Sequence, residues 1–299
     1  MSTFAYDGPP PQVSFEVFPP KTDKGRANLW TALERLDALG PAFYSVTYGA
    51  GGGERDRTQA LVSDIQAKLA APAAAHLTCV GAPRSEIDAI ADAYWDAGVR
   101  HIVALRGDPP DGVGADYEPH PDGYAYAADL VGGLARRHPF DISVAAYPET
   151  HPQAPSADFD IENLKRKADA GATRAITQYF FDNVDYLRFR DRAAAAGVTI
   201  MLEPGVMPVA NYAQVARFSA ACGARVPGWM AAWFDRVADD PPATLSAGAA
   251  ICAEQCLGLM REGVDAFHFY TLNKPDLTLQ VCRMLGVRPK TAGAEAAAA

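Results

Sequence analysis

The 299-residue sequence predicts an α/β protein: a single-domain (βα)8 TIM barrel with extra helices between its seventh and eighth strands. Three observations favour this fold class. Short runs rich in β-branched and aromatic residues alternate with amphipathic helical stretches, which is typical of a parallel sheet. These runs mostly begin about 30 residues apart, the length of one strand–loop–helix unit. No linker divides the chain, and α/β barrels often extend over ~250 residues as one domain.

The predicted strands are short and apolar, as expected for strands that are covered on both faces. They are expected at residues 13–18, 43–48, 74–80, 101–106, 141–147, 174–181, 199–204 and 266–272. We expect residues 12–290 to form the barrel, and residues 1–11 and 291–299 to be mobile.

The predicted helices show apolar residues at spacings of three or four. The first helix carries Leu29, Leu33 and Leu36, and Gly40 ends it. Extra helices fill the long gap before the last strand, at residues 211–221, 229–237 and 242–261. The aromatic stripe of the middle one, residues 229–234, is open to two interpretations: a subunit interface or part of the core.

Composition and charge exclude several classes of protein. The formal charge of -9, with 36 acidic and 27 basic residues, argues against a nucleic-acid binder. No signal peptide and no apolar run near ~18 residues is visible, so we expect a cytoplasmic protein without a membrane span.

The cysteines are scattered and odd in number, which indicates reduced thiols. Cys252 and Cys256 lack partners at zinc spacing, so core packing is favoured and no metal site is predicted.

Unusual polar residues follow the predicted strands at their carboxyl ends, where barrel enzymes place their active sites. They are Thr47, Tyr48, His76, Thr78, Arg106, Gly107, Asp108, Tyr147, His151, Gln178, Glu203, Asn273 and Lys274. A barrel without a binding site would not need this set.

Glu16 lies in the middle of a predicted strand, between Phe15 and Val17. Burial disfavours the charged carboxylate, raises its pKa and makes it a candidate general acid. The alternative is a carboxylate paired with an interior Arg or Lys.

Three other features leave two interpretations open. Asp108 is either a functional carboxylate or the surface partner of Arg106. Gln178 either contacts a ligand or satisfies backbone groups. The basic run at residues 163–167 is either a solvated helix face or a diphosphate site.

Several segments together resemble the methylenetetrahydrofolate reductase family, in its bacterial single-domain type. They are SFEVFPP (14–20), SVTYGA (45–50), GERDRT (53–58), HLTC (76–79), ALRGD (104–108), AAYPE (145–149), NLKRK (163–167), AITQ (175–178) and FHFYTLN (267–273). These segments occur in the family's order and cover residues 12 to 288.

The resemblance implies a barrel that binds FAD without a Rossmann fold. NADH or NADPH would reduce the flavin and leave, and a folate would then bind at the same flavin face and take the hydride. It implies that Glu16 is the general acid and that Asp108 contacts both flavin and folate, tuning the flavin. Homo-oligomers are also expected.

The resemblance also assigns the binding residues. The implied FAD contacts are Tyr48, Ala50, His76, Arg106, Gly107, Asp108, Ala127, Tyr147, His151, Ala154, Asp160, Asn163, Arg166 and Lys167. Thr47 would contact the nicotinamide nucleotide, and Gln178 both nucleotide and folate. The remaining folate contacts would be Gln214, Phe218 and Lys274.

The sequence departs from the family pattern at three positions. Val17 replaces a more frequent Phe, which indicates a packing change. Glu203 stands where an aliphatic residue is common, and we expect an extra carboxylate at the catalytic face. Lys274 replaces an Arg at the folate-tail contact and loses the two-pronged grip on a carboxylate. A pairing of Glu203 with Lys274 is the alternative role for both residues.

Two other functions compete with this one. Another flavin-dependent barrel, similar to proline dehydrogenase, would not need folate. A non-catalytic flavin- or folate-binding barrel would not need Glu16, Asp108 and Gln178 together.

Overall fold

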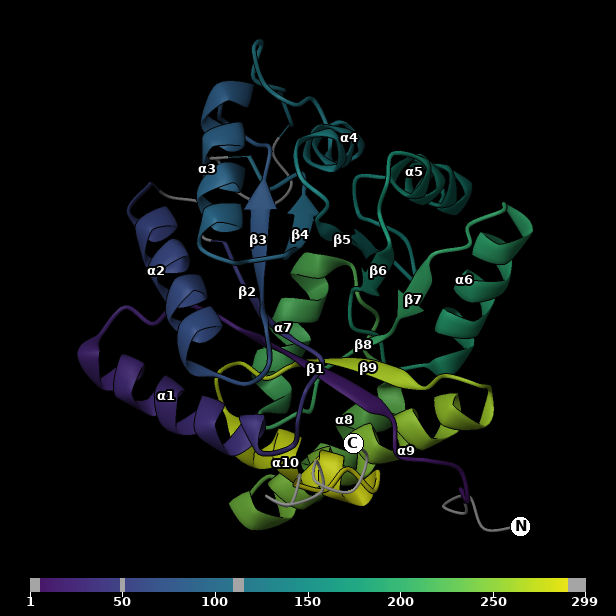
Figure 1. Cartoon of the computed structure of the whole chain (residues 1–299). Coiled ribbons are helices and arrows are strands. Elements are labelled where there is room, and N and C mark those ends of the chain that lie inside the picture. The colour runs from purple at the N-terminus through teal and green to yellow at the C-terminus, as the bar shows by residue number, and fades with distance from the viewer. Residues whose placement is uncertain (1–5, 49–51, 110–115, 290–299) are drawn as a thin grey trace.

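The computed structural model describes residues 6–48, 52–109 and 116–289. Within these ranges nine parallel strands form one sheet, in the order β7-β6-β5-β4-β3-β2-β1-β9-β8. The sheet curves into a nearly closed barrel with helices around it (Figure 1). The predicted fold class, an α/β TIM-type barrel in one domain, is therefore confirmed. The predicted mobility of the two ends concerns segments largely outside the described residues and stays a prediction.

The strands are short, as expected. They are β1 Gln12–Val17, β2 Tyr44–Val46, β3 Ala73–Thr78, β4 His101–Leu105, β5 Asp141–Ala146, β6 Arg174–Thr177, β7 Met201–Glu203, β8 Gly205–Val206 and β9 Ala266–Tyr270. The predicted sixth strand continued to residue 181, but β6 ends at Thr177. The aromatic residues that follow leave the sheet, and Phe180 stacks on Tyr186 with ring centroids 5.5 Å apart.

The helices follow the predicted order. They are α1 Asp23–Asp37, α2 Gly52–Lys68, α3 Arg84–Asp96, α4 Ala127–Arg137, α5 Ala157–Asp169, α6 Asn183–Ala195, α7 Tyr212–Cys222, α8 Gly228–Asp235, α9 Pro241–Arg261 and α10 Pro275–Met284. In α1 the Thr22 side chain accepts a hydrogen bond from the amide of Gly25, which caps the helix. Leu29, Leu33 and Leu36 are buried on one face of α1, as their spacing predicts.

The seventh barrel strand is broken into two pieces. β7 pairs with β6, and β8 pairs with β9, so the break carries the chain from one side of the barrel seam to the other. Pro204 lies at the break and has no amide hydrogen for a sheet ladder. A Cβ at Gly205 would lie 2.1 Å from the carbonyl oxygen of Thr177, so only glycine permits this close approach. The strand predicted at 199–204 is therefore shorter in the structure and ends at Glu203, because Pro204 cannot continue the ladder.

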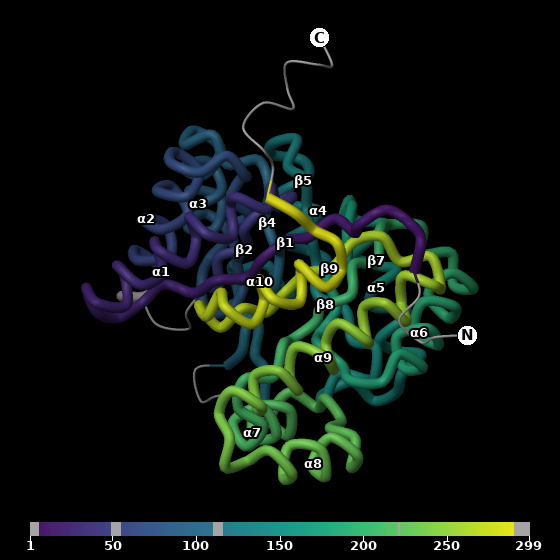
Figure 2. Tube along the Cα trace, turned by 90° about the horizontal axis from the view of Figure 1, so that it is seen from below, coloured from purple at the N-terminus to yellow at the C-terminus, as the bar shows by residue number. Residues whose placement is uncertain are grey.

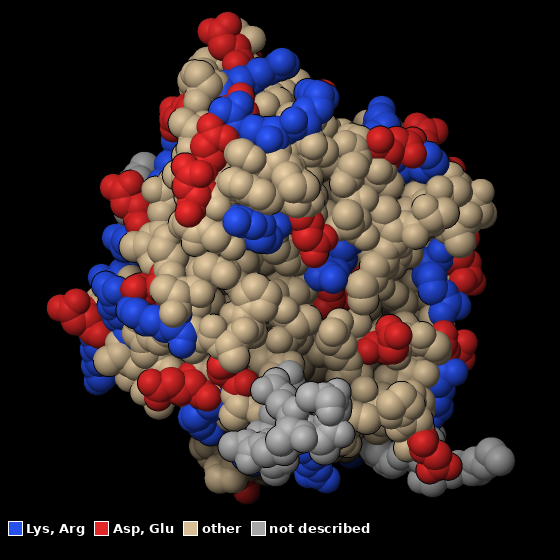
Figure 3. All heavy atoms as spheres, viewed as in Figure 1, with Lys and Arg blue, Asp and Glu red and all other residues tan. Residues whose placement is uncertain are grey.

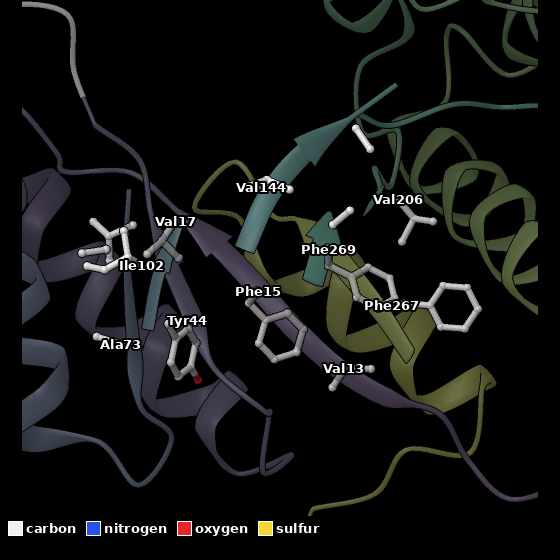
Figure 4. Packing of buried hydrophobic residues seen from close by; sticks show 14 of the residues in the cluster. Val13, Phe15, Val17, Tyr44, Ala73, Ile102, Val144, Val206, Phe267 and Phe269 are labelled. Atoms are coloured by element: carbon white, nitrogen blue, oxygen red, sulfur yellow. The ribbon is translucent and has the colours of Figure 1, made fainter. Parts of the chain in front are cut away.

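The strands alternate between the two sides of the barrel wall. Val13, Phe15 and Val17 of β1 belong to the main core between sheet and helices (Figure 4). Ser14 and Glu16 alternate with them and point into the lumen. A smaller cluster inside the barrel, which includes Phe43, Ala74 and Val103, closes the amino end of the lumen.

The segment between β8 and β9 forms the excursion of α7, α8 and α9, which extends to one side of the barrel (Figure 2). The aromatic stripe of α8 divides: Met230 and Phe234 are buried, whereas Trp229 and Trp233 are about half exposed. The core interpretation is thus confirmed for Met230 and Phe234, and a subunit interface at Trp229 and Trp233 stays a prediction.

Helix α9 is the one described helix whose length and apolar composition would allow a membrane span. Half of that window is buried inside the protein, and α9 packs against α10 as a core helix would. The thiols of Cys252 and Cys256 lie in this core, as predicted.

Candidate active site at the carboxyl end of the barrel

The side chain of Glu16 points from β1 into the barrel lumen, near the carboxyl end of the strand. Burial raises the pKa of this carboxyl to about 8. Its Oε2 lies 3.7 Å from His76 Nε2 on β3. Burial lowers the pKa of His76 to about 3, so the imidazole is neutral at pH 7. The raised pKa favours the protonated form of Glu16 at pH 7, and within the described residues its ion-pair-distance neighbour is His76 rather than an Arg or Lys.

Glu203 is a second lumen carboxyl, and the structure corrects its expected place. Its side chain is only 3% exposed and does not reach the catalytic face. Ser14 Oγ donates a 2.6 Å hydrogen bond to Glu203 Oε1, and Arg174 Nε lies 3.3 Å from Oε2. The alternative of a Glu203–Lys274 pair is wrong as well, because Arg174 and Ser14 occupy the carboxylate. A carboxylate can be buried inside the barrel only where a cation and hydrogen-bond donors compensate for its lost hydration.

The hydrogen bonds around Glu203 continue across the lumen and fix the state of His268. Since Ser14 donates to Glu203, its oxygen accepts from His268 Nδ1 at 2.7 Å. His268 Nε2 then accepts from Ser45 Oγ at 3.1 Å. Burial holds the pKa of His268 well below its usual range, which agrees with a neutral ring. This inner layer was not predicted from the sequence, although Ser14 and His268 alternate with aromatic residues in their strands, a pattern that indicates side chains on the lumen side.

The loop after β4 presents Asp108. Its carboxylate is 58% exposed and lies 4.0 Å from Arg106, so the surface pair is weak and the carboxylate stays accessible. Gly107 has φ +84°, and a Cβ there would lie 2.5 Å from Val80 Cγ1. Glycine thus lets this loop pack tightly on the loop after β3. Arg106 lies over the ring of Tyr117, 4.7 Å from its centroid.

The loop after β5 and the following helix gather positive charge. Lys167 is buried, and its Nζ donates a 2.8 Å hydrogen bond to the carbonyl of Ala145. The pKa of Lys167 is lowered to about 8, mainly by burial; Asp160 opposes this shift, and repulsion from Arg106 and Arg166 adds to it. A buried ammonium with a single carbonyl partner favours an anion in the neighbourhood. Lys167 is thus not part of a solvated helix face, although Lys165 and Arg166 lie on more open sides of α5.

The same loop is organised by Asp160 and two rings. His151 donates its backbone amide to Asp160 Oδ2 at 2.6 Å. The rings of Tyr147 and His151 meet edge to face, with centroids 4.6 Å apart. Ser156 caps α5 by accepting from the amide of Phe159, which starts the helix that carries the basic run.

Gln178 lies just beyond β6 and lines a narrow cavity with Tyr147 and Cys222. Its Oε1 accepts a 3.0 Å hydrogen bond from the amide of Tyr179, so part of its amide does satisfy backbone. Within the part of the chain that the structure describes, the side-chain nitrogen of Gln178 donates to no protein group, so it is available to a ligand.

The residues expected to contact folate lie on the other side of this face. Gln214 and Lys274 line one shallow cavity together. Phe218 lies one helical turn further along α7 and is 44% exposed. Asn273, with φ +57°, holds the loop of Lys274 in place: its amide group exchanges two hydrogen bonds with the backbone of Phe18, at 3.0 and 2.8 Å. Backbone in this rarely adopted region is often found at binding sites.

Most of the remaining predicted residues lie on carboxyl-end loops or at helix starts, and Asn163 lies in the middle of α5. Thr47 and Tyr48 follow β2, Ala127 begins α4, and Ala154 and Asn163 belong to the β5–α5 loop and to α5. Ala50 lies outside the described residues. Figure 3 shows charges of both signs interspersed over the surface in this view, without a field of one sign. The predicted residues are therefore gathered at one end of the barrel, and Glu203 is the exception.

Comparison with known proteins agrees with this geometry. The family model described as methylenetetrahydrofolate reductase matches residues 6–286. The 5,10-methylenetetrahydrofolate reductase of Pectobacterium carotovorum is 50% identical over 94% of this chain and 92% of its own length. That of Escherichia coli is 50% identical over 93% and 91%. Methylenetetrahydrofolate reductase (NADH) 1 of Arabidopsis thaliana is 34% identical over 92% of this chain but 48% of its own length.

Solved structures show the same fold at low identity. An uncharacterised protein from Clostridium thermocellum that binds two copies of 5-methyl-5,6,7,8-tetrahydrofolic acid has a TM-score of 0.59 and 12% identity, over 92% of this chain and 94% of that one. A dihydropteroate synthase from Xanthomonas albilineans has a TM-score of 0.51 and 12% identity, over 93% and 92%. The family model and the sequence relatives carry the assignment further than fold alone: this chain belongs to the methylenetetrahydrofolate reductase family.

Proposed function

We propose that the chain is a flavin-dependent oxidoreductase that interconverts 5,10-methylenetetrahydrofolate and 5-methyltetrahydrofolate. FAD would carry the hydride, and NADH or NADPH would supply it in a ping-pong cycle. The observation that carries this proposal is Glu16, a partly buried carboxyl near the carboxyl end of β1, whose pKa burial raises to about 8. Membership in the family supports the substrate, and the position and raised pKa of Glu16 support its role as the acid that the reaction needs.

The residues present fit an FAD molecule. The buried ammonium of Lys167, together with Arg106 and Arg166, suits a diphosphate, since charge-assisted hydrogen bonds to phosphate are strong. Tyr147, His151, Asp160 and Asn163 would hold the rest of the cofactor on the same loops. When bound, FAD supplies a two-electron carrier that accepts and returns a hydride.

Glu16 would donate its proton to the bridging ring nitrogen of methylenetetrahydrofolate. Protonation weakens the bond between that nitrogen and the bridging carbon, so the ring opens and the carbon becomes electrophilic. A carboxyl with a pKa of about 8 is mostly protonated at pH 7 and can act in this way. His76, being neutral, leaves the proton on Glu16.

The other side chains would bind and orient. Asp108 offers an exposed carboxylate that stabilises positive charge developing on the folate. Gln178 would hydrogen-bond both substrates in turn, Thr47 would contact the nicotinamide nucleotide, and Phe218 would stack on the bound ligand. Gln214 and Lys274 would hold the folate at the shallow cavity that they share. A cytoplasmic homo-oligomer remains part of this proposal.

Anaerobic rapid mixing tests the proposal. The purified protein should be yellow, NADH or NADPH should bleach its flavin, and methylenetetrahydrofolate should restore the colour. Comparing NADH with NADPH identifies the donor. Bleaching without reoxidation by folate would point to a different flavin-dependent barrel, and a colourless protein that binds no FAD would contradict the proposal.

A further inference from the structure

The C-terminal end of α7 is fastened to the loop after β5. Glu149 of this loop accepts the backbone amide of Arg225 with both carboxylate oxygens, at 3.0 and 2.9 Å. Arg225 is the third residue after α7, and the Glu149 side chain is 18% exposed. A carboxylate that grips a backbone amide is a charge-assisted bond, stronger than a bond between neutral groups.

A second contact joins the same two segments. Gly223 caps α7 with φ +73°, and a Cβ there would lie 2.8 Å from Pro152 Cγ. The end of α7 therefore rests against the β5–α5 loop at two points, Glu149 and Pro152. Between these contacts the helix and the loop together line the narrow cavity that also contains Gln178.

The side chain of Arg225 extends the attachment to α6. Its Nη2 lies 2.7 Å from Asp185 Oδ2 and 3.4 Å from Asp182 Oδ2. Three carboxylates, from Glu149, Asp182 and Asp185, thus converge on one residue. Of the three, Glu149 accepts from the backbone amide of residue 225, whereas Asp182 and Asp185 contact its side chain. A substitution of the Arg225 side chain would therefore leave the Glu149 bond in place, and only a change of Glu149 itself removes it.

We propose that Glu149 is a positioning residue that clamps α7 to the β5–α5 loop, so that occupancy of this loop by FAD sets the placement of Gln214 and Phe218. The inference rests on the proposed function, because the loop carries Tyr147 and His151, proposed contacts of FAD, and α7 carries the proposed folate contacts. The coupling is reciprocal: whatever stabilises the loop stabilises the attached helix end.

Cys222 provides a readout that does not depend on turnover. It is the last residue of α7 and is partly buried, whereas Cys79, Cys252, Cys256 and Cys282 are buried in the core. Burial raises the pKa of Cys222, so its labelling by a thiol reagent is slow while α7 is docked. Labelling located by mass spectrometry then reports local opening of the helix end.

The experiment compares Glu149→Ala, Glu149→Gln and the control Arg192→Ala, each with and without FAD. Arg192 and Glu149 both line a second cavity of about 440 Å³ beside the end of α7, but the 2.6 Å bond of Arg192 joins α6 to Asp158 of α5. We expect Glu149→Ala to speed Cys222 labelling about tenfold in the FAD-free protein, since a bond to a charged group is lost. Glu149→Gln, which keeps one acceptor, should fall between, and Arg192→Ala should match the wild type.

FAD should protect Cys222 in the wild type, and the protection factor should fall toward one in Glu149→Ala. The folate KM of Glu149→Ala should rise several-fold while kcat changes less than about twofold, because the acid is untouched. Equal protection in the two proteins would mean that FAD shields the thiol directly, and would overturn the coupling. Equal labelling of Glu149→Ala and wild type without FAD would overturn the clamp.

If Glu149→Ala unfolds as a whole, the four core cysteines are labelled as well. In that case the rate of Cys222 labelling in Glu149→Gln, compared with the wild type, decides whether Glu149 clamps α7. The two proposals can fail separately. A protein that binds no FAD would contradict the proposed function, while the FAD-free labelling rates would still decide whether Glu149 clamps α7.

Discussion

Glu16 and Glu203 are two carboxyl groups inside one barrel, and they have different surroundings. Burial raises the pKa of both. The Ser14 hydroxyl and the Arg174 guanidinium both lie within 3.3 Å of the Glu203 carboxylate. Glu16 instead lies beside the neutral imidazole of His76, at 3.7 Å. Partners, rather than burial alone, thus separate a carboxylate that holds the barrel together from an acid that can give up a proton.

The comparison has a counterpart in the two levels of the lumen. At the inner level, Ser45, His268, Ser14 and Glu203 form a linear chain of hydrogen bonds, and Arg174 faces Glu203 as an ion pair without, among the described residues, a hydrogen bond from its Nε or Nη1. At the carboxyl end, the side chains of Glu16, Asp108 and Lys167 keep capacity for further bonds. Satisfied groups stabilise, and groups with spare capacity bind ligands.

The largest expected effect comes from breaking the inner pair. Arg174→Met leaves the carboxylate of Glu203 buried without its cation, so we expect a loss of about 3–5 kcal/mol in the free energy of unfolding. Adding Glu203→Leu removes the unpaired charge and should restore most of this loss. Denaturant titration of the wild type, Arg174→Met and the double variant measures both the loss and its recovery. If Arg174→Met were as stable as the wild type, the Arg174–Glu203 pair would not be structural.

The next effect concerns the cations at the carboxyl end. Lys167→Ala removes a buried ammonium that we assign to the FAD diphosphate, and a charge-assisted bond contributes about 1.5–3 kcal/mol. FAD should therefore bind at least roughly tenfold more weakly. Equilibrium dialysis of FAD at low and high salt measures it. Unchanged affinity would return the basic run to a structural role.

The raised pKa of Glu16 also predicts a pH dependence of stability. Between the ordinary value of 4.5 and about 8 the folded protein holds a proton on Glu16 that the unfolded chain has released. Proton binding by Glu16 therefore stabilises the folded state fully below pH 4.5, and this stabilisation is lost as the pH rises to about 8. Glu16→Gln should therefore raise Tm relative to wild type more at pH 8 than at pH 5. A constant difference in Tm across this range would mean that the carboxyl titrates normally.

The smallest effect is expected at Lys274. An ammonium binds a folate-tail carboxylate as a point charge, whereas a guanidinium offers two parallel bonds. Lys274→Arg should lower the folate KM by a few-fold and leave kcat and flavin reduction unchanged, because the tail is remote from the reacting atoms. An unchanged KM would place the tail elsewhere. Glu203 cannot compensate, since it is bound to Ser14 and Arg174.

The barrel itself could be predicted from sequence because its signals are local: apolar spacing, strand length and glycine stops. The polar residues at the strand ends could be predicted for the same reason, whereas their roles come from the family resemblance and stay predictions. The break at Pro204 and the inner position of Glu203 could not, since they depend on which neighbours meet across the barrel seam. Arg174 and Glu203 lie 29 positions apart, and only the register of β6 and β7 brings them together.

The central claim is that Glu16, and not Glu203, is the acid of the folate half-reaction. Anaerobic stopped-flow of Glu16→Gln, with Glu203→Gln as the matched control, tests it most directly. We predict that Glu16→Gln reduces flavin with NADH within roughly tenfold of wild type, while flavin reoxidation by methylenetetrahydrofolate falls by at least ~100-fold, the usual contribution of acid catalysis. Glu203→Gln should lose stability but keep the ratio of the two rates. Equal losses in both half-reactions of Glu16→Gln would contradict the account and make Glu16 a structural carboxyl.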